Sequence, residues 1–241
     1  VLEEAGSFSF VEPEEKGAIV SDQEGLVRDW ILSNEMRVLC KQSELEKGQV
    51  LIRLQSDRGV LQLSESDWVS GNLITQYMDA SGLNGLSRAA FFSYLQSRGI
   101  EMNMAISMNA TEIAFSTPKE HLKTVFQVIH ELYRPFRFDP SRWPIVLAQH
   151  QEMQKQILNS PEILFSFYIQ NQNTQNHYFF RPLELSLAQR ERAEALAPHF
   201  FADPKRFTAI IVGDVDVEEI KEFAMQYLAS IPCRKTEGEF S

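Results

Sequence analysis

The amino-acid sequence predicts an α+β fold, a largely antiparallel sheet of about five or six strands with helices packed on one face. Three observations predict it. Short segments have strand character, with a period of two over residues 49–55 and 101–108, and longer ones have apolar residues with a period near 3.6. The strands come in runs separated by groups of helices, rather than one helix after each strand. A chain of 241 residues with 44% hydrophobic residues can also bury a sizeable core.

The first strands follow a segment with no helical pattern. Residues 29–32 and 37–41 flank Ser33 and Asn34, which favour turns, so the pair predicts a hairpin. Residues 49–55 alternate apolar and polar side chains and predict a third strand.

Two helices and a second hairpin come next. Ser64 is a candidate N-cap for an apolar stripe over residues 64–77, and a second helix is expected over 87–99. Residues 101–108 then alternate with a period of two, which does not fit a helix. Residues 111–116 are the expected partner strand.

Three further helices each begin with an N-cap residue followed by proline at the first helical position. The start signals are Thr117-Pro118, Asp139-Pro140 and Ser160-Pro161, and they predict helices over residues 117–133, 139–158 and 160–173.

The C-terminal part predicts a helix, a strand and a last helix. Ser186 with Gln189 is expected to cap a helix over residues 186–200. Residues 207–212 are apolar on both faces, as in a central strand. Asp216 opens the last helix in a capping-box pattern.

The chain divides into a linker, one domain and a tail. Residues 1–25 are acidic and interrupted by glycine and proline, which predicts an interdomain linker outside the main fold or packed along it. We expect deletion of residues 1–16 to leave thermal stability nearly unchanged. Residues 26–235 form the expected single domain and residues 236–241 a tail. The first residue is Val1, which suggests a piece of a longer protein.

Charge and composition exclude several classes of function. The net charge of -10 and the pI near 5.1 disfavour binding to nucleic acid or to an anionic membrane surface. No apolar stretch is long enough to span a membrane. The two cysteines, Cys40 and Cys233, are too few for a disulfide framework, and Cys40 lies in a strand where a core role is expected.

Three groups of residues point to a known family. They are Leu32-Ser33-Asn34-Glu35-Met36-Arg37-Val38, Phe136-Arg137-Phe138-Asp139, and Ile211-Val212-Gly213-Asp214-Val215-Asp216 leading to Ser230-Ile231-Pro232. In this order they resemble the insulinase/pitrilysin family of zinc peptidases, over nearly the whole chain after the linker. The resemblance implies an insulinase/mitochondrial-processing-peptidase-like domain. It also implies repeated domains, of which only one carries the zinc motif H-x-x-E-H.

The chain lacks that motif. In the family, two histidines at i and i+4 hold zinc, the glutamate between them activates water, and a later helix adds a third ligand. The corresponding positions here are about residues 71–75, allowing a slip of a residue or two, and Gln149 or His150. Residues 68–81 contain no histidine and one carboxylate, Asp79. We therefore assign no catalytic and no metal-binding residue, and expect zinc only in a catalytic domain of the parent protein.

Other candidate sites are weak. His130-Glu131 begins an HExxH motif, but Arg134 stands in place of the second histidine. The remaining histidines, His121, His150, His177 and His199, have no partner at i+4 and are expected to be structural. The sequence Gly82-Leu83-Asn84-Gly85 predicts a turn rather than a phosphate loop, and Met102, Met104 and Met108 predict a sheet face under helices.

The loop over residues 176–182 combines polar and aromatic side chains and resembles a loop of non-catalytic domains in the family. His177, Tyr178 and Arg181 are its candidates for a chamber or partner contact, against a purely structural role.

The sequence thus predicts a non-catalytic domain of a bacterial insulinase-like zinc metalloprotease. The domain would form part of a substrate-enclosing chamber and of an interdomain interface. Its expected partners are the other peptidase domains of the parent and, indirectly, unfolded peptide. The resemblance implies the periplasm. A stand-alone non-peptidase scaffold or binding subunit of the same fold is the alternative, and a catalytic domain upstream in the parent reading frame would distinguish the two.

Overall fold

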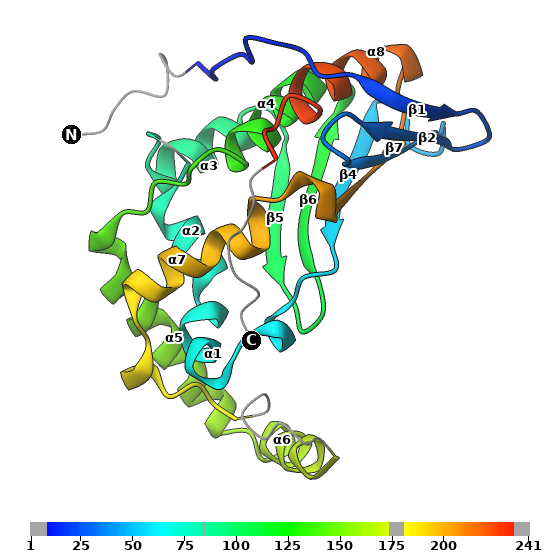
Figure 1. Ribbon diagram of the computed structural model, residues 1–241. Coiled ribbons are helices and arrows are strands. Elements are labelled where there is room, and N and C mark those ends of the chain that lie inside the picture. The colour runs from blue at the N-terminus through cyan, green and yellow to red at the C-terminus, as the bar shows by residue number, and fades with distance from the viewer. Residues whose placement is uncertain (1–8, 84, 174–180, 234–241) are drawn as a thin grey trace.

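The computed structural model describes residues 9–83, 85–173 and 181–233, and it shows one sheet with the helices gathered on one side (Figure 1). The sheet has the order β1-β2-β3-β7-β4-β6-β5. Neighbouring strands are antiparallel except β3 and β7, which are parallel. The strands are β1 Ile19–Gln23, β2 Arg28–Leu32, β3 Arg37–Gln42, β4 Gln49–Ser56, β5 Glu101–Ile106, β6 Thr111–Pro118 and β7 Phe207–Gly213.

Within the described residues there are eight α-helices. They are α1 Glu65–Asn72, α2 Ile74–Ser81, α3 Arg88–Gln96, α4 Leu122–Leu132, α5 Trp143–Leu158, α6 Pro161–Asn173, α7 Arg190–Phe201 and α8 Val217–Phe223. A π-helical turn, Ala224–Leu228, continues α8. None of these helices is long and apolar enough to cross a membrane.

The two faces of the sheet differ in burial, as the alternating strand sequences predict. Val50, Ile52 and Leu54 on β4 are 0 to 2% exposed, whereas Leu51 and Arg53 between them are exposed. The buried face continues through the neighbouring strands at matching register positions, such as Ala209 on β7 and Ile113 on β6 opposite Leu54. Helices therefore cover one face, and the described residues leave the other face largely open to solvent.

The sheet has seven strands and not the five or six expected, because β1 was missed. Ile19–Gln23 pairs antiparallel with β2 at the edge of the sheet. Its sequence, IVSDQ, has two exposed polar residues at its end and no sustained alternation, so the hydrophobic pattern is weak. The sheet thus begins before residue 26, where the domain was expected to start.

The segment before β1 also packs on the domain. The carboxylate of Glu12 accepts a hydrogen bond of 2.6 Å from the Tyr227 hydroxyl and one of 2.6 Å from the Gln127 amide. The Phe10 ring meets the Tyr94 ring edge-on, with centroids 5.8 Å apart. The expected linker is therefore attached to the fold from about residue 10. Its role between domains of a longer protein remains a proposal, and the expected tail at residues 236–241 lies outside the described residues.

Two predictions of where a helix begins, at Thr117 and at Ser186, are wrong. Thr117 and Pro118 complete strand β6, which pairs with β4 as far as Gln49, and α4 starts only at Leu122 after a short 3-10 turn. Ser186 lies in another 3-10 turn and bonds Glu184, so Gln189 becomes the N-cap of α7. In both places strand pairing or a tight turn replaces the first turn of the expected helix.

The other start signals are confirmed. Ser87 accepts a hydrogen bond from the Ala90 amide at the start of α3, and Asp216 accepts from the amides of Glu218 and Glu219 at the start of α8. Asp139 likewise accepts from the Ser141 amide before α5.

Candidate functional site

The candidate site lies where α2 meets α5, at the positions that the family resemblance implies for zinc ligands. The expected helix over residues 64–77 is interrupted at Leu73, between α1 and α2. Gln76 on α2 faces His150 on α5, with Oε1 of the glutamine 3.3 Å from Nδ1 of the histidine. With His150 as the later-helix position that the resemblance implies, this contact would place the motif positions at Asn72, Thr75 and Gln76, one residue later than residues 71–75.

The side chains at these positions do not fit zinc. Zinc in proteins is bound by thiolate, imidazole and carboxylate groups, and amides or hydroxyls are poor substitutes. Asn72 instead donates a hydrogen bond of 2.7 Å to the Trp68 carbonyl. His150 is the single ligand-type side chain in the set. Among the described residues no group of three His, Cys, Asp or Glu side chains could hold a metal ion.

His150 is held in a neutral environment. Its side chain is 9% exposed, and burial lowers the pKa of its imidazole below the usual value. Because Gln76 presents its amide oxygen, the hydrogen on the neutral ring belongs on Nδ1. The arrangement is a hydrogen bond between two helices, not an acid–base pair poised for catalysis.

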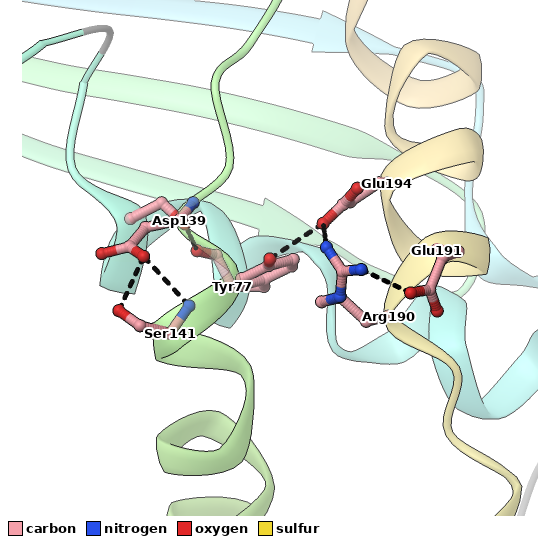
Figure 2. Close-up of polar contacts among 7 residues, drawn as sticks. Tyr77, Asp139, Ser141, Arg190, Glu191 and Glu194 are labelled. Carbon is pink, nitrogen blue, oxygen red and sulfur yellow. Dashed lines mark hydrogen bonds and ion pairs between the residues drawn. The ribbon is translucent and has the colours of Figure 1, made fainter.

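A polar network behind α2 fixes this helix against α7, as Figure 2 shows. The Tyr77 hydroxyl donates to Oε1 of Glu194 at 2.9 Å, and Arg190 donates to the same oxygen at 3.0 Å. Arg190 also pairs with Glu191. Burial, followed by the neighbouring Glu194, raises the pKa of Tyr77 to about 12, so the phenol stays protonated and can serve as a donor.

A second contact joins the end of α2 to the start of α5. The Asp139 amide donates to the Ser81 hydroxyl at 3.1 Å. The Asp139 carboxylate accepts from Ser141 and caps the turn that begins at Pro140 (Figure 2). The Tyr77 ring packs between Phe138 and Trp143, with centroids 4.7 and 5.1 Å away. Sequence reasoning found Asp139 as a cap but missed Tyr77 and Glu194, because their pairing spans more than a hundred residues.

An open cavity of about 550 Å³ adjoins the same end of α2 and reaches the edge strand β5. Its lining is mainly apolar, and Thr75 of the motif positions is part of it. The Asp79–Arg88 ion pair, at 2.7 Å, lies at this cavity, and both side chains are 55% exposed. The principal apolar side chains that line the cavity are Phe91, Phe92, Leu95, Met102, Met104 and Phe136. The volume and lining suit an apolar side chain or a short apolar segment.

The other sequence candidates lie elsewhere. His130 and Glu131 are on α4, and Arg134, which breaks the HExxH pattern, donates to Glu131 at 3.0 Å in an ion pair. His199 accepts a hydrogen bond of 2.9 Å from Arg58. Burial and this cation lower the pKa of His199 to about 4.

Cys40 is in the core, as expected, at 1% exposed, and burial raises the pKa of its thiol to about 11. The Met102 and Met104 side chains pack against the core from β5, which confirms the sheet-face interpretation. Gly82 follows α2 in a turn with a φ of 82°, and Asn84 lies outside the described residues.

The predicted contact loop is described only in part. His177 and Tyr178 lie outside the described residues, and Arg181 is exposed just after them. The role of this loop stays a prediction.

The comparisons with known proteins point to one family. No protein-family model matches the chain. A curated relative from Arabidopsis thaliana, "Zinc protease PQQL-like", is 25% identical over 209 residues, which is 86% of this chain and 20% of the relative. The periplasmic protease PqqL from Escherichia coli superposes with a TM-score of 0.81 over 92% of this chain, at 19% identity.

The chain has the fold of the insulinase-type peptidase domains. A peptidase M16 inactive domain from Pseudomonas fluorescens matches 86% of it with a TM-score of 0.72 at 14% identity, and pitrilysin matches 92% with a TM-score of 0.70 at 13% identity. The family resemblance inferred from the sequence is confirmed.

The chain spans only a part of the proteins that it resembles. It covers 25% of PqqL and 26% of a ferredoxin protease, FusC, but 48% of a structure of the first half of PqqL. The first half of PqqL is therefore about twice as long as the part that this chain matches.

Proposed function

We propose that the chain is a non-catalytic domain of an insulinase-like zinc metalloprotease, where it forms part of the substrate-enclosing chamber and of an interdomain interface. The observation that carries the proposal is the pairing of an insulinase-type fold with Asn72, Thr75 and Gln76 at the zinc-motif positions. A domain with this fold and without ligands cannot activate water on zinc. Zinc would then be held by a separate catalytic domain of the parent.

The chamber role is supported by the cavity beside β5. In a zinc-bearing domain the motif helix faces the substrate, so the same surface is the one proposed to face the chamber here. That surface offers an apolar cavity and a strand, β5, at the edge of the sheet. An edge strand can hydrogen-bond an extended peptide, and a neighbouring apolar cavity can accept a side chain.

A cross-linking experiment in the parent protein tests this role. Phe92 lines the cavity and is 49% exposed, so F92C can carry a photoreactive benzophenone without disturbing the core. L26C is the matched control. Leu26 is 96% exposed and lies between β1 and β2, at the opposite edge of the sheet from β5 and the cavity. Illumination in the presence of an unfolded peptide should label the peptide from F92C alone. Equal labelling from both positions, or none from either, would contradict the chamber role.

Zinc dependence of the parent distinguishes a zinc protease from a stand-alone scaffold. A chelator should abolish peptide hydrolysis by the full-length parent, and zinc should restore it. A parent reading frame without an H-x-x-E-H domain would instead support the stand-alone scaffold. We propose a periplasmic location because the similar PqqL is described as periplasmic.

A further inference from the structure

Helix α6 is attached to the domain by one side only. It lies at the end of the molecule farthest from β1 and β2, beyond α1 and α5 (Figure 1). None of its thirteen residues, Pro161–Asn173, is buried, although all of them are described. Its principal packing partner is α5, which precedes it in the chain.

The exposed face of α6 is apolar. Phe165, Tyr168 and Ile169 are 66, 59 and 42% exposed, and their i, i+3 and i+4 spacing places them on one face of the helix. From Ile163 to Asn173 the helix carries no charged residue. Met153 and Leu158 of α5 are also exposed, at 41 and 47%. Isolated helices of about this length are marginal in water, and burial of an apolar face normally stabilises them.

We propose that α6 packs, through Phe165, Tyr168 and Ile169, against a second domain of the same polypeptide chain. This inference rests on the proposed function, which makes the chain one domain of a longer protease. The first half of PqqL and the inactive domain from Pseudomonas fluorescens are each roughly twice as long as the part that this chain matches, so a parent of this type would have room for a neighbouring domain of comparable size.

The chemistry of the face favours a protein domain over a membrane. Helices that lie on anionic lipid carry Lys and Arg on their polar face, whereas α6 has Glu162 as its one charged residue and the chain has a net charge of -10. The buried core of a protein–protein interface is apolar and poor in charge, and the exposed face of α6 has that composition. The other candidate partner for this face is a second copy of the chain. The experiment below distinguishes the two partners, because protection by a second copy would depend on protein concentration.

Hydrogen–deuterium exchange compares α6 in the 241-residue chain and in the full-length parent. The amides of α6 should exchange about tenfold or more slowly in the parent, since docking suppresses local opening. F165E in the parent should return exchange to the fast rate. L45E is the matched control, because Leu45 is 95% exposed on a loop remote from α6, and it should change nothing.

Three results would overturn the docking proposal. They are equal exchange of α6 in the two proteins, protection in the isolated chain that rises with its concentration, and a reading frame that encodes no further domain. A separate measurement tests the proposed function, namely whether a chelator abolishes peptide hydrolysis by the unmodified parent. If the parent is active and α6 exchanges equally fast in both proteins, only the docking proposal is contradicted. If the parent is inactive and α6 exchanges more slowly in the parent, only the protease assignment is contradicted.

Discussion

The imidazole of His150 on α5 lies opposite the side-chain amide of Gln76 on α2, with 3.3 Å between Nδ1 and Oε1. The family resemblance implies that these two positions correspond to ligand positions on two different helices of a zinc-bearing domain. The contact shows that α2 and α5 approach each other closely enough for a direct side-chain hydrogen bond.

We predict that two substitutions create a zinc site at these positions. Asn72→His together with Gln76→His would place two imidazoles at i and i+4 beside the native His150, a three-histidine set known from catalytic zinc sites. The double variant should bind one zinc per chain with a submicromolar dissociation constant on the order of those of natural sites. Isothermal titration calorimetry measures it.

The single variant N72H is the control, since it leaves two histidines and should bind zinc weakly. Absence of zinc binding in a folded double variant would show that the register at Asn72, Thr75 and Gln76 is wrong.

We predict that the ion pair of the buried Asp67 with the partly exposed Arg192 stabilises the contact between α1 and α7. Arg192 donates to both carboxylate oxygens, with 2.7 Å from Nη2 to Oδ2, and this hydrogen bonding holds the pKa of Asp67 below its usual value. Asp67 is 3% exposed, so D67A should lower the free energy of unfolding by about 1 to 3 kcal/mol. Urea denaturation measures this change.

The Asp79–Arg88 pair supplies the control for that measurement. Both side chains are 55% exposed, so D79A should change stability by less than about 0.5 kcal/mol. Equal effects of the two variants would mean that burial of Asp67 does not govern its contribution.

We predict that stability falls as the pH drops below about 7, partly through His199. Its pKa in the folded chain is about 4, against about 6.5 when unfolded. Between these values the unfolded state binds a proton that the folded state does not, so acid favours unfolding. The loss from pH 8 to pH 5 should be on the order of 1 to 2 kcal/mol for this group.

Thermal unfolding of the native chain and of H199Q across this pH range measures the effect. Glutamine can still accept the hydrogen bond from Arg58, and it does not titrate. The pH dependence should therefore be flatter in H199Q. Parallel curves would assign the acid sensitivity to other groups.

We predict that deletion of residues 1–16 lowers the melting temperature, contrary to the expectation from the sequence. The deletion removes Glu12, which accepts hydrogen bonds from Tyr227 and Gln127, and Phe10, which packs on Tyr94. The loss should be about 1 to 2 kcal/mol, or roughly 3 to 8 °C for a chain of this size. E12A with the segment retained should show part of this decrease, and an unchanged melting temperature in both would restore the linker interpretation.

Strong local patterns predicted most of the elements, and long-range pairing decided the rest. The alternation in β4 and the caps at Ser87 and Asp216 act over a few residues, and the structure confirms them. Strand β1 is stabilised by its partner β2 rather than by its own pattern, so the sequence did not show it. Pro118 fits a helix start by composition, but pairing with Gln49 keeps it in a strand.

The same distinction holds for the site. The empty zinc motif could be read from residue types, whereas its register needed the contact of Gln76 with His150. The pairing of Tyr77 with Glu194 joins helices more than a hundred residues apart and has no local signal. Predictions from one sequence therefore did not reach the polar network that holds α2 against α7.

The zinc content of the isolated, unmodified chain tests the central claim most directly. The chain is purified without chelator, incubated with one equivalent of zinc, desalted and analysed by elemental mass spectrometry. With Asn72, Thr75 and Gln76 at the ligand positions, the account predicts far less than one zinc per chain after desalting. One tightly held zinc per native chain would contradict the assignment of a non-catalytic domain.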